Sequence, residues 1–176
     1  NETTPNLKSL AIIAQTNSFK INQDLYENLL TASQYKNILD LKIILKKIIC
    51  DIELTININS NSFKNIHLEE VEVSKIIIKF SNRDKDINIY ISGGMLNDLE
   101  LIDENSNSKF QKNIILEDVK ISKIENKIIN SNYDILDSNI SNLFLPANNF
   151  AEKTKIKIID SGSNRIPTIK KDTSTN

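Results

Sequence analysis

The stretch that most constrains the fold is SFKNIHLEEVEVSKI at residues 62–76, because it recurs as FQKNIILEDVKISKI at residues 110–124. From Lys64 and Lys112 onward the two copies align without a gap, at a constant offset of 48 residues. An internal repeat of this kind indicates a fold assembled from equivalent structural units.

Each copy alternates apolar and polar residues, the pattern of a strand with one buried face. In the first copy, Ile66 and Leu68 precede a paired acidic step, after which Val71 and Val73 resume the alternation. The step from Leu68 to Val71 is odd, so a face switch or bulge is needed for both apolar pairs to reach one side. Such a bulge would curve the sheet, and the second copy predicts a bulge at the equivalent position.

Further strands are predicted where the alternation returns, at residues 52–59, 87–91 and 155–158. Gly93-Gly94 predicts a hairpin turn, because tight turns need positive φ. Residues 39–49 fit a helix or a strand, and their β-branched content favours a strand. Residues 24–30 predict a short helix capped by Asp24, with a strand as the alternative. The expected fold is therefore mostly β, with repeated antiparallel strands as in a β-sandwich.

The domain organisation follows from where the alternation begins and ends. Residues 1–8 are a polar tail, residues 9–160 form a single β domain, and residues 161–176 are polar and predicted to be disordered. The longest apolar run, residues 10–14, falls far short of the roughly 20 residues of a spanning helix. The polar start without Met suits a membrane tether before residue 1, following a removed signal or a lipidated cysteine.

Composition argues against several classes of function. A net charge of −1 gives no electrostatic footprint for nucleic acid. His67 and Cys50 are the single histidine and cysteine, so no zinc spacing exists. Three glycines cannot form a phosphate-binding loop. Adjacent acidic residues in a strand face opposite sides and do not converge on a substrate. We therefore expect a non-enzymatic protein without a cofactor or metal.

The remaining feature is the abundance of aliphatic side chains over aromatic ones, which make up 6% of the chain. Composition alone favours an ordinary closed β-sandwich core. An aliphatic sheet surface that stays partly open would instead suit acyl chains, whose burial is worth about 0.8 kcal/mol per CH₂.

Over residues 52–160 the chain resembles the periplasmic bridge proteins of lipopolysaccharide transport. The resemblance lies in runs of the form Asn-Ile-x-Leu-Glu-x-Val-x-Val, in the strand at residues 86–92 leading into Gly93-Gly94, and in residues 126–134 followed by a short strand at 140–145. It implies an open β-jellyroll folded like a taco, whose interior shelters lipid. It also implies end-to-end stacking with homologous modules through edge strands. The chain departs from that family in having few turn glycines and a poorly matching N-terminal third.

The leading functional hypothesis is thus a non-catalytic, periplasmic or cell-envelope module that binds and bridges lipopolysaccharide or another lipidated cargo. The alternative is a surface lipoprotein or adhesin-type β domain that binds a host or partner protein. The residues expected to line the acyl-chain site are the repeated aliphatic positions: Ile66, Leu68, Val71, Val73, Ile114, Leu116, Val119 and Ile121.

Overall fold

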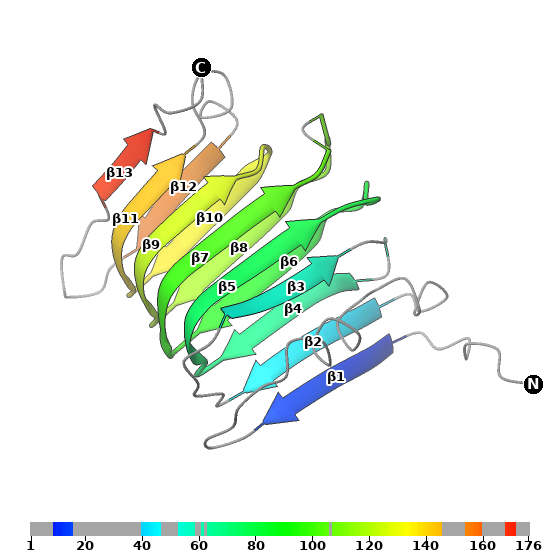
Figure 1. Ribbon diagram of the computed structural model, residues 1–176, viewed down its shortest axis with the longest axis horizontal. Helices are drawn as coiled ribbons and strands as arrows, with labels where there is room; N and C mark the ends of the chain where they lie inside the picture. The colour runs from blue at the N-terminus through cyan, green and yellow to red at the C-terminus, as the bar shows by residue number, and fades with distance from the viewer. Residues whose placement is uncertain are drawn as a thin grey trace, which may run out of the picture.

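The computed structural model describes residues 9–15, 40–46, 53–58, 61, 63–105, 107–145, 154–159 and 168–171. These residues contain thirteen strands arranged in two sheets, and no helix. Figure 1 shows the sheets lying one behind the other, with the chain passing back and forth between them. The mostly β character expected from the alternation is confirmed.

Sheet A has seven strands in the order β1-β2-β4-β6-β8-β10-β12. Their bounds are Ser9–Gln15, Asp40–Lys46, Phe63–Glu69, Ile87–Ser92, Lys112–Glu117, Ser131–Leu136 and Thr154–Ile159. Sheet B has six strands in the order β13-β11-β9-β7-β5-β3. In that order their bounds are Thr168–Lys171, Asn139–Leu145, Lys120–Lys127, Met95–Asp103, Glu72–Phe80 and Glu53–Ile58.

Every strand pairing in the two sheets is parallel. From β2 onward, successive strands alternate between sheet A and sheet B, so the chain winds as a β-solenoid in which each coil stacks on the one before. The predicted antiparallel jellyroll or sandwich is therefore wrong. Alternation reports only that one face of a strand is buried, and it does not distinguish a parallel partner from an antiparallel one.

The 48-residue repeat spans two coils rather than one structural unit. Ile66 pairs with Ile89, which is 23 residues further on, and Ile89 pairs with Ile114 after 25 more. The intervening coil keeps the Asn-apolar-x-apolar start at residues 88–91 but has Gly93-Gly94 where its neighbours have an acidic residue and Val. That local difference hides the shorter period in the sequence.

Four corners join sheet A to sheet B through a residue in the left-handed backbone region. The residues are Glu70, Gly93, Asp118 and Asp137, with φ of 53°, 67°, 51° and 47°. Gly93-Gly94 is thus a corner between sheets and not the predicted hairpin turn. The odd step from Leu68 to Val71 is the corner at Glu70. It turns both side chains into the interior. Backbone hydrogen bonds continue through it, as in Glu70 N–H to Ser92 O at 2.8 Å.

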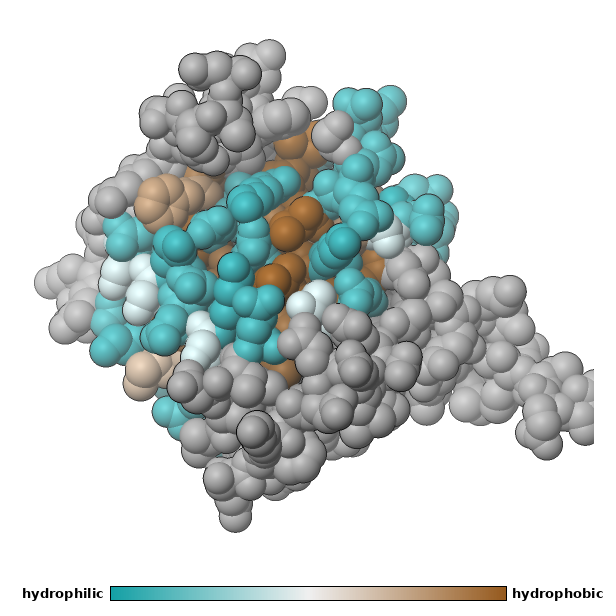
Figure 2. Space-filling model, in the orientation of Figure 1, coloured by the Kyte–Doolittle hydropathy of each residue, from teal (hydrophilic) through white to brown (hydrophobic). Residues whose placement is uncertain are grey.

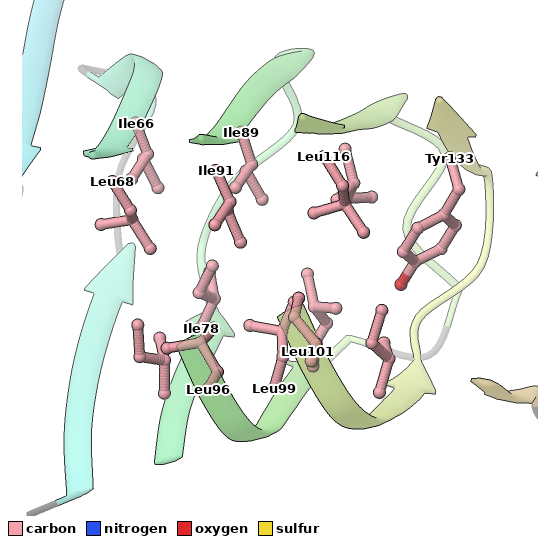
Figure 3. Packing of buried hydrophobic residues seen from close by; sticks show 14 of the residues in the cluster. Ile66, Leu68, Ile78, Ile89, Ile91, Leu96, Leu99, Leu101, Leu116 and Tyr133 are labelled. Atoms are coloured by element: carbon pink, nitrogen blue, oxygen red, sulfur yellow. The ribbon is translucent and has the colours of Figure 1, made fainter. Parts of the chain in front are cut away.

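The space between the sheets is filled with aliphatic side chains. Figure 3 shows Ile66, Ile89 and Leu116 of sheet A pointing toward Ile78 and Leu99 of sheet B. These five side chains are fully buried. Close packing of branched side chains against in-register neighbours is the main stabilising interaction of this fold.

Four other expectations concern residues 1–49 and the C-terminal segment. β2 lies within residues 39–49 and confirms the strand that their β-branched content predicts there. β13 lies within the segment predicted to be a disordered C-terminal tail. The N-terminal tail of residues 1–8 and the short helix predicted at residues 24–30 fall outside the described residues.

Candidate functional site

The eight residues expected to line an acyl-chain site all point into the solenoid interior. They are at most 5% exposed, the value for Val73, and they belong to one hydrophobic cluster. Residues from the coil between the two repeat copies, such as Ile89 and Leu96, belong to the same cluster. An acyl chain would therefore have to displace side-chain contacts to occupy this interior.

The outer face of sheet A carries a ladder of asparagines, one on each of four adjacent strands. The Nδ2 group of Asn88 donates to Asn65 Oδ1 at 3.2 Å, that of Asn113 to Asn88 Oδ1 at 3.0 Å, and that of Asn132 to Asn113 Oδ1 at 3.2 Å. Parallel in-register pairing brings equivalent amides to the spacing of adjacent strands, about 4.8 Å, where they can bond. The ladder fixes the register of β4, β6, β8 and β10 from outside the core.

Beside the asparagine ladder runs a more apolar column. The rings of His67 and Tyr90 are stacked, with centroids 4.6 Å apart and an interplanar angle of 10°. Ile115 pairs with Tyr90 on the next strand, and all three side chains are half-buried. The column beyond them holds Glu69 and Glu117. This face therefore has an aromatic and aliphatic centre with amides on one side and carboxylates on the other. We call it the Tyr90 face.

The outer face of sheet B has a different chemistry, dominated by ion pairs. Glu100 forms ion pairs with Lys75, at 3.2 Å, and with Lys127, while Lys123 pairs with Glu125 at 2.8 Å. The hydrogen bond from Lys123 lowers the pKa of the Glu125 carboxyl. Figure 2 shows this side of the molecule, where polar residues cover most of the described surface around a band of apolar ones. Paired surface charges of this kind solubilise a sheet and contribute little stability.

A buried polar cluster lies where β7 leads into β8. Lys112, the first residue of β8, is fully buried, and its Nζ donates to Ser108 Oγ and to the carbonyl of Ile129, both at 2.9 Å. The same Nζ lies 3.5 Å from Asp103 Oδ2 and 3.9 Å from the centre of the Phe110 ring. Burial lowers the pKa of Lys112, because desolvation outweighs the attraction of the nearby carboxylates.

A second buried polar group is satisfied within the core. The hydroxyl of Tyr133 donates to Asn126 Oδ1 at 2.8 Å, and the Asn126 amide in turn donates to Ser131 Oγ at 3.3 Å. Tyr133 is fully buried, and burial raises the pKa of its phenol. The network satisfies polar atoms that would otherwise be left without partners in the core.

Sequence reasoning did not identify the asparagine ladder or the Lys112 cluster. The ladder had a signal, since Asn65 and Asn113 hold the same place in the repeat copies, but biased composition makes asparagine uninformative by itself. Lys112 also has an equivalent in the first repeat copy, Lys64, but the side chain of Lys64 is exposed. At Lys112 the longer β7–β8 connection contributes Ser108 and Phe110, which add to Asp103 of β7 and the Ile129 carbonyl.

Among the described residues, no group of three or more His, Cys, Asp or Glu side chains could hold a metal ion. Within the same residues no helix is long and apolar enough to cross a membrane. The chain matches no family model, no curated protein and no solved structure.

Proposed function

We propose that this protein is a non-catalytic β-solenoid scaffold that binds a partner protein through the Tyr90 face. The observation that carries the proposal is the arrangement of this face, in which His67, Tyr90 and Ile115 form a continuous column between amides and carboxylates. Protein interfaces are built this way, with an aromatic or aliphatic centre inside a polar rim.

The backbone beneath the Tyr90 face also supports partner binding. β4, β6 and β8 are each paired on both sides, and the asparagine ladder ties their outer surfaces together. A face held in this way loses little conformational entropy when a partner binds, which favours affinity. The opposite face, where charges already neutralise one another, is the natural comparison.

The test uses two matched isoleucines on opposite faces. Ile115 points outward from sheet A and Ile102 from sheet B, and both are half-buried. A photo-reactive phenylalanine analogue in place of Tyr90 would capture the partner from an extract of the source cells. Ile115→Glu should reduce partner binding about thirtyfold, because a hot-spot residue contributes at least about 2 kcal/mol. Ile102→Glu should leave it unchanged.

Equal loss of binding in both variants would contradict the proposal, provided that both keep the wild-type unfolding midpoint. A capture product that excess unlabelled protein does not compete away would contradict it as well.

Lipid carriage and an envelope location stay predictions from the sequence. Native mass spectrometry in the presence of a fluorescent fatty acid would test the first. Displacement of the probe by lipopolysaccharide would support it, and failure of the folded protein to take up the probe would exclude it. Edge-strand stacking also stays a prediction. The strands at the ends of the described sheets are β1 and β12 in sheet A and β3 and β13 in sheet B.

A further inference from the structure

The buried cluster between β7 and β8 has a geometry that a structural ion pair does not require. Ser108 stands between the two charged groups: its Oγ accepts from Lys112 Nζ at 2.9 Å and donates to Asp103 Oδ2 at 2.5 Å. The other carboxylate oxygen, Asp103 Oδ1, accepts the backbone N–H of Asn105 at 2.9 Å. Each of the two carboxylate oxygens of Asp103 therefore has its own hydrogen-bond donor.

Both groups are also removed from water. The side chain of Lys112 is completely buried and that of Asp103 is 5% exposed. The ring of Phe110 lies 3.9 Å from Nζ. A buried ion pair is costly to maintain, since the desolvation of two charges offsets their attraction. Transfer of one proton from Lys112 to Asp103 would replace the ion pair with a neutral amine beside a neutral acid.

We propose that Lys112 and Asp103 form an intramolecular amide bond, a cross-link between the start of β8 and the end of β7. The inference is independent of the partner-binding function proposed above. Nζ lies 3.5 Å from Oδ2, the oxygen that would leave as water, so the amine is held beside the carboxyl group that it would attack. Condensation of an amine with an acid needs no oxidant and no further reactant.

The reaction forms one bond, between Nζ and the carboxyl carbon, and breaks one, between that carbon and Oδ2. The lone pair of neutral Nζ attacks the carboxyl carbon of protonated Asp103, and the developing negative charge on Oδ1 is stabilised by the Asn105 N–H. A proton from Nζ passes through the Ser108 hydroxyl to Oδ2. The bond between the carbon and Oδ2 then breaks, and Oδ2 leaves as water with two protons. The amide keeps one N–H, which can still donate to the carbonyl of Ile129.

The lowered pKa of Lys112 supports this course, because it increases the fraction of the amine that carries a free lone pair. Exclusion of water also disfavours the reverse reaction, hydrolysis of the amide. Ser108 acts here as a proton relay, and its removal should slow the reaction about a hundredfold, a typical loss for a positioned acid–base group.

The experiment is an intact-mass measurement on the full chain, followed by tryptic mapping. A cross-linked protein is one water lighter than its sequence, and trypsin releases residues 86–109 joined to residues 110–120, uncut after Lys112. A linear protein gives the full mass and separate peptides 110–112 and 113–120. The linear result, in protein kept folded at neutral pH for days, would overturn the proposal.

Variants separate the cross-link from other losses of water. Lys112→Arg retains the charge but cannot form the bond, so it should show the full mass. Loss of water that persists in this variant would assign the mass change to cyclisation of an aspartate and overturn the proposal, as would absence of the branched peptide in the wild type. Ser108→Ala should accumulate the cross-link more slowly, whereas Ser138→Ala, a second buried serine, should not change its rate. Equal rates in all three proteins would refute the role of Ser108 as relay.

Discussion

Replacement of Gly94 by alanine tests the close stacking of coils at the corner between β6 and β7. Gly94 has φ of +81°, and a Cβ there would lie 2.3 Å from the carbonyl oxygen of Val71 and 2.6 Å from its nitrogen. These are backbone atoms of the neighbouring coil, so they cannot rotate away as a flexible side chain could. The coils must separate locally to accept even one methyl group.

The magnitude follows from what that separation disturbs. Alanine in the left-handed region costs about 1–2 kcal/mol. Two of the backbone hydrogen bonds at this corner use the Gly94 or Val71 carbonyl oxygen, from Met95 N–H to Val71 O at 3.0 Å and from Lys120 N–H to Gly94 O at 3.2 Å. The loss of each costs about 0.5–1.5 kcal/mol. Together these effects predict that Gly94→Ala lowers the free energy of unfolding by about 2–5 kcal/mol.

Urea titration followed by circular dichroism measures this loss, and Gly93 provides the matched control. A Cβ at Gly93 meets first the Cγ of Glu70 at 3.3 Å, a flexible group. Asp118 and Asp137 already occupy the equivalent corner position with positive φ. Gly93→Asn should therefore change stability by less than about 1 kcal/mol. If both variants unfold at the wild-type urea concentration, the stacking argument is refuted.

Three further predictions concern polar groups, each measured as a change in the free energy of unfolding. Tyr133→Phe should lower it by about 1–3 kcal/mol, because the buried Asn126 oxygen loses its donor; an unchanged value would mean that water reaches Asn126. Asn113→Ala removes two ladder hydrogen bonds and Asn132→Ala removes one. The first variant should therefore lose more stability, about 1–2 kcal/mol in total. A larger loss in Asn132→Ala would contradict the stabilising role of the ladder. The folded state lowers the pKa of Glu125, so its stabilisation is present above pH 4.5 and is lost as pH falls through the folded-state pKa. Glu125→Gln should thus cost at most about 1 kcal/mol at pH 7 and nothing at low pH, and a cost that persists in acid would rule out this carboxylate as its source.

The candidate sites differ in how far the sequence could predict them. The positions of buried aliphatic residues were correct, because period-two alternation is a local property of each strand. The Tyr90 face was not predicted, since His67, Tyr90 and Ile115 are 23 and 25 residues apart and meet only through strand pairing. The partners of Lys112 come from the end of β7 and from the β7–β8 and β9–β10 connections, whose paths alternation does not specify.

The sequence by itself determined that the chain is mostly β, which residues face its interior, and that it has a single histidine, a single cysteine and three glycines. Those properties depend on residue type and on spacing within single strands. Only the tertiary structure decided that the strands are parallel, that they divide between two sheets, and that the 48-residue repeat spans two coils. The reason lies at the corners: residues such as Glu70 and Asp118 adopt positive φ there and send the chain into the opposite sheet. Glutamate and aspartate do not predict such a turn, whereas Gly93-Gly94 does. Even the glycines do not indicate whether the chain pairs with the preceding strand as a hairpin or crosses to the other sheet.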